Sequence, residues 1–137
     1  MKRSDFQELA ALRLKEARLL LKANCHEGAY YLAGYAAECA LKACIARRTE
    51  RFEFPDLKIA QESWGHDLSK LAKTAALDEK LREATNRDAE LNLNWTIVTK
   101  WKLDSRYQRR SLAEAAALIS AVEDRNHGIF RWLKRHW

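Results

Sequence analysis

Residues that interrupt helices are scarce in this chain, whose 137 residues include only four Gly and one Pro. Folds rich in β-strands need many tight turns, and tight turns depend on these two residue types. Their scarcity argues against a β-rich fold and favours long helices. The chain is long enough to enclose a hydrophobic core, and 47% of its residues are hydrophobic. We therefore expect one all-α domain over residues 1–137.

Cysteines are also few, and their spacing matches no disulfide framework or zinc motif. The three are Cys25, Cys39 and Cys44, an odd number without a CxxC pair. Cys39 and Cys44 fall within an apolar, helix-like run, which predicts buried thiols. Free thiols are typical of a reducing compartment. We therefore expect a cytoplasmic protein that needs neither a metal nor another cofactor.

A long uninterrupted apolar run is absent as well. The longest apolar stretch, residues 29–46, contains Glu38 and Lys42 near its middle. It is also slightly short for crossing a bilayer. The first residues lack the apolar segment of a signal peptide. We therefore expect residues 29–46 to be a buried helix, and we expect no association with a membrane.

Apolar periodicity and capping signals predict an up-and-down bundle of four to five helices. Ser4 with Gln7, and Ser111 with Glu114, have the spacing of capping boxes. The second predicted helix is apolar on almost every side, which places it at the centre of the bundle. The predicted helices are 5–23, 27–48, 66–76, 78–101 with an interruption near 91–94, and 111–135 with a kink at Gly128.

Between residues 51 and 65 the helical periodicity is lost. This segment contains Phe52, Phe54, Pro55 and Trp64. We expect a loop that is held in place by its aromatic side chains.

The net charge of +6 is concentrated in the last third of the chain. Residues 1–96 contain 16 Lys or Arg and 15 Asp or Glu, whereas residues 97–137 contain 9 Lys or Arg and only 4 Asp or Glu. Such an excess attracts ligands that carry phosphate. Aromatic residues between the cations could stack on bases, but they could equally be core anchors beside solvated cations. The cluster comprises Lys100, Trp101, Lys102, Arg106, Tyr107, Arg109 and Arg110.

Two pairs of polar residues could support such a site. Glu38 and Lys42 are four residues apart on the predicted central helix, where they could form a structural ion pair. Alternatively, Glu38 could hold Arg106 for an anionic ligand. His66 and Asp67 have the character of a helix start, although His66 could instead contact phosphate or transfer a proton.

Three motifs follow one another along the chain. Residues 29–43 read AYYLAGYAAECALKA, residues 66–71 read HDLSKL, and residues 101–107 read WKLDSRY. In this order they resemble the alanine-rich "AAE-xx-LKA", "H-D-L-xx-L" and "W-xxxx-RY" motifs of the HEPN family of small helical domains. The resemblance implies a helical bundle that commonly dimerises and associates with nucleotides or RNA. It also implies a nucleotidyltransferase partner, since many relatives form toxin–antitoxin-like pairs with a minimal nucleotidyltransferase.

Some HEPN proteins are metal-independent ribonucleases, which carry an Arg followed five to seven positions later by a His. The resemblance therefore implies Arg131 and His136 as candidate catalytic residues. This match departs from the family pattern, because Trp132 stands where a polar residue is usual. Arg125-Asn126 has the usual first pair but no His at the required distance.

Three hypotheses follow from these observations. The first is a homodimeric HEPN-type module that binds nucleotide or RNA phosphates through the cluster at residues 100–110. The second is a metal-independent, toxin-like endoribonuclease in which Arg131 stabilises charge on the phosphate and His136 acts as general acid or base. The third is a structural or antitoxin-like dimer that has no ligand.

Overall fold

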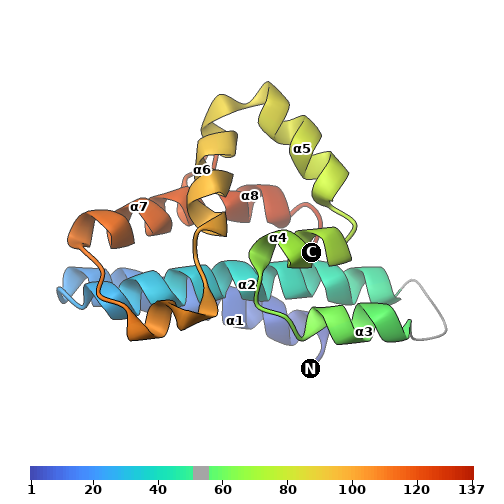
Figure 1. Ribbon diagram of the computed structural model, residues 1–137, viewed down its shortest axis with the longest axis horizontal. Helices are drawn as coiled ribbons and strands as arrows, with labels where there is room; N and C mark the ends of the chain where they lie inside the picture. Colours follow the sequence, from blue (N-terminus) through green and yellow to red (C-terminus); the bar gives the residue numbers. More distant parts are fainter. Residues whose placement is uncertain (51–55) are drawn as a thin grey trace.

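The computed structural model describes residues 1–50 and 56–137, and the regular elements in these two ranges are all helices (Figure 1). The all-α prediction is therefore confirmed for the described part of the chain. None of the helices described there combines the length and the apolar character that a bilayer crossing requires. The elements are α1 (Arg3–Lys22), α2 (His26–Glu50), α3 (Leu57–Ser63), α4 (Leu68–Thr74), α5 (Asp78–Arg87), α6 (Ala89–Thr99), the 3₁₀ helix η1 (Leu103–Tyr107), α7 (Leu112–Glu123) and α8 (Ile129–Leu133).

The longest helices, α1 and α2, lie side by side and form the base of the molecule (Figure 1). The turn between them is closed by Asn24, whose φ of 60° is left-handed. The N–H of Cys25 bonds the carbonyl of Leu20, and that of Asn24 bonds Leu21. This is the Schellman arrangement that ends many helices, and Asn tolerates the left-handed position.

The predicted capping box at Ser4 is wrong, because Ser4 already lies inside α1. The helix begins two residues earlier than predicted, at Arg3, and Lys2 is its N-cap residue. The backbone N–H of Lys2 donates to Asp5 Oδ2 at 2.7 Å. Asp5 also places a negative charge in the first turn, where the helix dipole favours it.

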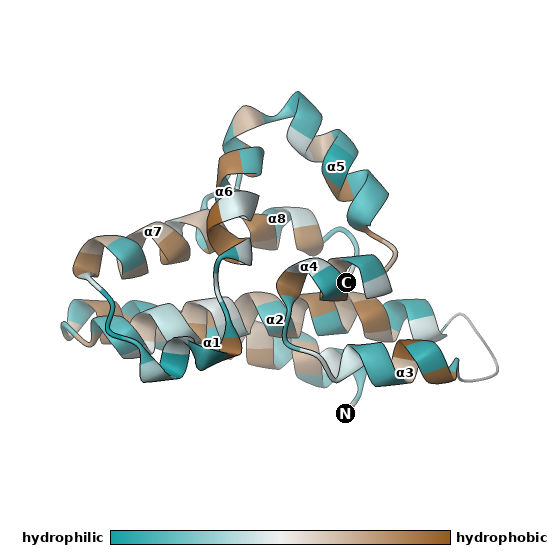
Figure 2. Ribbon diagram, viewed as in Figure 1, coloured by the Kyte–Doolittle hydropathy of each residue, from teal (hydrophilic) through white to brown (hydrophobic). Residues whose placement is uncertain are grey.

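The prediction that residues 29–46 form the central, buried helix is confirmed. In α2, small side chains such as Ala33, Ala36 and Ala37 are fully buried. They allow α1, α4, α7 and α8 to pack around this helix. Figure 2 shows apolar residues recurring along α2, whereas α5 is largely hydrophilic.

Trp101 follows α6 in the chain and packs against the central helix α2. Its side chain is fully buried, and its indole lies on Gly34 of α2. A Cβ added to Gly34 would lie 2.1 Å from Trp101 Cδ1. Glycine is therefore required at position 34 by the close approach of the indole ring.

The prediction of a loop over residues 51–65 is wrong where the structure describes it, because α3 occupies Leu57–Ser63. The Asp56 side chain caps this helix by accepting the N–H of Lys58, a start signal that the apolar periodicity did not reveal. Trp64 is 81% exposed, so it does not pin the segment. Phe52, Phe54 and Pro55 lie outside the described residues.

The helix predicted over 78–101 is divided into α5 and α6 at Asp88, rather than near 91–94. Asp88 is extended, with φ −129° and ψ 99°, and its carboxylate accepts the N–H of Leu91. The side chain thus ends one helix and caps the next. The predicted helix start at Asp67 is confirmed, because Asp67 Oδ1 accepts the N–H of Lys70.

The last helix is likewise two helices rather than one kinked helix. The Ser111–Glu114 capping box that opens α7 is confirmed. The Asp124 carboxylate then accepts the N–H groups of Asn126 and His127, which turns the chain before α8 begins at Ile129. A side chain hydrogen bond to the local backbone therefore outcompetes continuation of the helix.

Candidate anion-binding site

Three cations of the predicted cluster at residues 100–110 are paired with carboxylates. Lys102 Nζ lies 3.6 Å from Asp67, and Arg109 lies 3.5 Å from Glu27. Arg110 contacts Glu114 at 2.9 Å and also stacks 4.2 Å from the centre of the Tyr30 ring. Each pair cancels charge locally, so this surface attracts phosphate less than its sequence indicates.

The aromatic residues of this cluster have different environments. Trp101 is a core anchor, which excludes it as a surface for stacking bases. Tyr107 is 78% exposed, and the Arg106 guanidinium lies 4.9 Å from its ring centre. Lys100, Arg106 and Tyr107 therefore remain accessible, but they form an open surface rather than a pocket.

The Glu38–Lys42 ion pair is confirmed. Lys42 Nζ and His66 Nδ1 each lie 3.0 Å from Glu38 Oε1. Glu38 is buried, whereas the His66 side chain is partly exposed. These two residues, and not Arg106, hold the carboxylate in the described part of the chain. His66 thereby ties the segment before α4 to the central helix.

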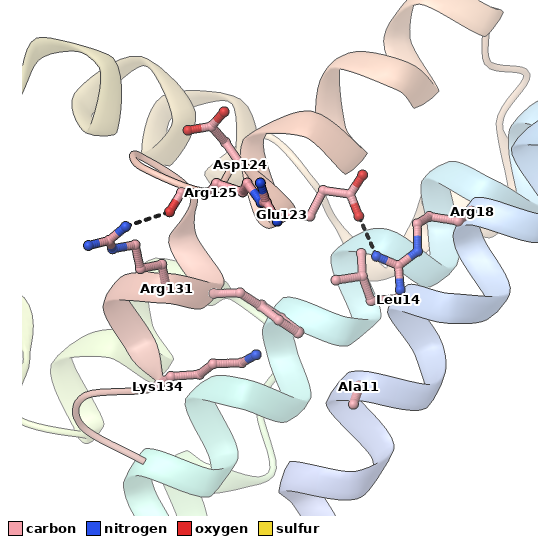
Figure 3. Close-up of a pocket in the computed structure, with 9 residues that line it drawn as sticks. Ala11, Leu14, Arg18, Glu123, Asp124, Arg125, Arg131 and Lys134 are labelled. Atoms are coloured by element: carbon pink, nitrogen blue, oxygen red, sulfur yellow. Dashed lines mark hydrogen bonds and ion pairs between the residues drawn. The ribbon is translucent and has the colours of Figure 1, made fainter.

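Arg131 and His136 line different pockets. Arg131 lies in the pocket of Figure 3, of about 540 Å³, between α1, α7 and α8. Its guanidinium donates to the carbonyl of Arg125 at 2.7 Å. On the other side of this pocket, Arg18 contacts Glu123 at 2.7 Å (Figure 3). Since Glu123 and Asp124 both line it, the positive charge there is partly cancelled.

A second pocket, of about 490 Å³, is more strongly cationic. Among the described residues, four cationic side chains and one imidazole line it, and no carboxylate does. We call it the α8 basic pocket. Its polar residues are Arg47 and Arg48 from the end of α2, Lys80 from α5, and Arg135 and His136 from the turn after α8.

Backbone contacts hold two of these side chains in place. Arg47 donates to the carbonyl of Arg135 at 3.3 Å, and Arg48 donates to the carbonyl of Thr74. The His136 ring contacts the Trp132 ring at a tilt of 48°, with 4.5 Å between ring centres. Each guanidinium has five N–H donors, so one backbone bond leaves most of them available to an anion.

The positive charge of the α8 basic pocket affects the pKa of His136. Burial lowers the pKa of its imidazole, and the nearby charges of Lys80, Arg47 and Arg135 lower it further. The ring is therefore neutral at physiological pH. Cys44 also lines the pocket, but burial raises the pKa of its thiol to about 12. It is therefore unreactive as a nucleophile.

The pocket is suited to anions that accept several hydrogen bonds, such as phosphate groups. Sequence reasoning had singled out His136 but not Arg47, Arg48, Lys80 or Arg135. The adjacent arginines at the end of the apolar α2 run were a usable signal.

In the described residues, no three His, Cys, Asp or Glu side chains gather in a way that could hold a metal ion.

Comparison with protein-family models, with curated proteins and with solved structures gives no significant match for this chain. Over residues 1–50 and 56–137, the chain is an all-α protein with a basic pocket that no carboxylate lines.

Proposed function

We propose that this protein is a HEPN-type module that binds the phosphate groups of nucleotides or RNA in the α8 basic pocket. The observation that supports this most is the composition of the pocket: among the described residues, Arg47, Arg48, Lys80 and Arg135 line it together with His136, and no carboxylate does. In such a site an anion gains charge-assisted hydrogen bonds and relieves repulsion among the cations.

The HEPN part of the proposal is supported by how the three motifs meet around α2. His66 of the second motif contacts Glu38 of the first at 3.0 Å, and Trp101 of the third packs on Gly34 of the first. Lys102 of the third motif lies 3.6 Å from Asp67 of the second. Residues far apart in sequence thus form one structural unit. We further propose that the module is a cytoplasmic homodimer with a nucleotidyltransferase partner.

The binding proposal predicts a selective effect of neutralising the pocket. Arg135→Gln and Lys80→Gln should each weaken binding of labelled single-stranded RNA about tenfold, since a hydrogen bond to a charged group contributes about 1.5–3 kcal/mol. Each should also lower the slope of log K against log[salt] by about one. Fluorescence anisotropy over a salt series measures both quantities, and inorganic phosphate should compete with the RNA.

Lys100→Gln and Arg106→Gln are matched controls, because they remove the same charge outside the pocket. They should weaken binding less than twofold. Equal losses for both pairs of variants would assign binding to net charge or to residues 100–110 and contradict the pocket. No binding by the unmodified protein would leave the structural-dimer hypothesis.

The pocket also predicts the pH behaviour of His136. Its pKa, read from the imidazole carbon-bound proton by NMR, should lie below the usual value of about 6.5. As pH falls, the His136 imidazole becomes protonated in the unfolded chain at a higher pH than in the folded chain. The contribution of His136 to stability is therefore present above about pH 6.5 and is lost as pH falls toward the folded-state pKa. Saturating phosphate or the Arg135→Gln substitution should raise the pKa. An unchanged pKa in both experiments would show that the anion binds elsewhere.

The endoribonuclease alternative is favoured by the lowered pKa of His136 among the cations of the pocket. A neutral imidazole would accept the proton of a 2′-hydroxyl as its oxygen attacks phosphorus, while Arg135 held the phosphate. The bond from phosphorus to the 5′-oxygen would break, the 5′-oxygen would take a proton as it leaves, and a 2′,3′-cyclic phosphate would remain. RNA cleavage that survives EDTA and is lost in His136→Ala would support this activity. A requirement for Arg131 as well would indicate that two copies of the chain combine their sites. Binding without cleavage would support the module alone.

A further inference from the structure

A groove of about 620 Å³ lies between α1, α2 and α3, and it shares no lining residue with the α8 basic pocket. Its walls are mainly apolar, with Phe6 from α1, Ile45 from α2, Ile59 from α3 and Trp64 from the end of α3. A concave, mostly apolar site with few polar groups is the usual form of a small-molecule site.

Glu38 is the buried polar residue of this groove. Its side chain is only 2% exposed, and its Oε1 atom accepts from both Lys42 and His66. The second oxygen, Oε2, is buried and has no hydrogen-bond partner among the described residues. A buried carboxylate oxygen without a donor is energetically unfavourable. The groove therefore contains a strong acceptor that has no donor among the described residues.

The charges of the lining side chains favour a cationic donor. Among the described residues that line the groove, Glu38 and Asp56 contribute two carboxylates and Lys42 contributes the single ammonium group. Lys42 also lines the groove, and its flexible four-carbon stem can turn to admit a donor to Glu38. Trp64 is exposed at the rim, so it is available to cover an apolar ligand body.

We propose that this groove binds a small organic ammonium ion, namely a protonated primary amine carried on an apolar body. The ammonium group donates to Glu38 Oε2, and the apolar body lies against Phe6, Ile59 and Trp64. Specificity for the amine follows from the buried acceptor, because a site built to receive a hydrogen bond discriminates against ligands that lack the donor.

Three ligands with one skeleton test this inference: 4-phenylbutylamine, 4-phenylbutanol and 4-phenylbutyrate. Titration of the unmodified protein at pH 7, followed by calorimetry and by NMR shifts of the Ile45 and Ile59 methyl groups, should show the amine binding at least tenfold more tightly than the alcohol. The carboxylate should bind more weakly than both. The ¹³C shift of the Glu38 carboxyl group should move with the amine and not with the alcohol.

Variants separate the two parts of the site. Glu38→Gln should lower the affinity for the amine to that for the alcohol. Trp64→Ala should weaken both ligands by the same factor, because it removes apolar wall without changing the acceptor. Leu57→Ala is the matched control: Leu57 is also exposed on this segment but does not line the groove, so it should change neither affinity.

Equal affinities for the amine and the alcohol in the unmodified protein would overturn the inference. An amine preference that persists in a folded Glu38→Gln variant would also overturn it. If Glu38→Gln does not fold, the Glu38 carboxyl shift in the unmodified protein decides the question, since a ligand that leaves this shift unchanged does not contact the carboxylate.

Discussion

Replacing Gly34 with alanine should lower the free energy of unfolding by about 3 kcal/mol, at the upper end of the cost of overpacking a core. The added Cβ would lie 2.1–2.3 Å from three atoms of the Trp101 indole, which is fully buried. A rigid ring enclosed on all sides cannot move aside without shifting its neighbours. A Gly→Ala substitution within a helix usually raises the free energy of unfolding by about 1 kcal/mol. At position 34 we expect the opposite effect.

Urea denaturation followed by circular dichroism measures this effect. Gly28→Ala is the matched control in the same helix, because its Cβ would meet only the end of the flexible Leu20 side chain, at 3.2 Å. That variant should remain within about 1 kcal/mol of the unmodified protein. Reducing the ring by Trp101→Leu in the Gly34→Ala background should recover part of the loss, because the two sites are in contact. A Gly34→Ala protein as stable as its parent would disprove the Trp101 packing.

Replacing Lys42 with methionine should also lower the free energy of unfolding by about 3 kcal/mol, because removing one partner leaves a buried charge uncompensated. Glu38 is almost completely buried, and Lys42 is its cationic partner on the same helix, with 3.0 Å between Nζ and Oε1. Methionine preserves the length and the apolar stem of lysine, so the change is mainly electrostatic. His66 remains bonded to Oε1, which keeps the loss from being larger.

The double variant Glu38→Gln/Lys42→Met should be more stable than the sum of the single effects predicts, with a coupling of about 1–3 kcal/mol. Arg106→Ala provides the contrast: combined with Glu38→Gln, its effect should be additive to within about 0.5 kcal/mol. Coupling between Glu38 and Arg106 would restore the interpretation in which Glu38 holds an arginine for a ligand. Additivity between Glu38 and Lys42 would show that the ion pair adds nothing to stability.

The helices were predicted more accurately than their boundaries. Apolar periodicity located α1 and α2, because a buried helix face repeats every three to four residues. An interruption was predicted near 91–94 and a kink at Gly128, but the breaks lie at Asp88 and Asp124. At each of these residues a carboxylate accepts backbone N–H groups and the helix ends. Asp56 caps α3 in the same way. Side-chain caps of this kind do not change the apolar periodicity from which helices are predicted.

The sequence by itself determined the all-α class, the central position of α2 and the Glu38–Lys42 pair, because residues four apart on a helix are neighbours whatever surrounds them. The tertiary structure alone decided which charges are cancelled. Packing places Asp67 beside Lys102 and Glu27 beside Arg109, which neutralises the richest run of cations. Packing also gathers Arg47, Lys80 and His136 in one pocket, which no carboxylate of the described residues lines. Electrostatic attraction depends on distances in space, and only the folded chain defines those distances.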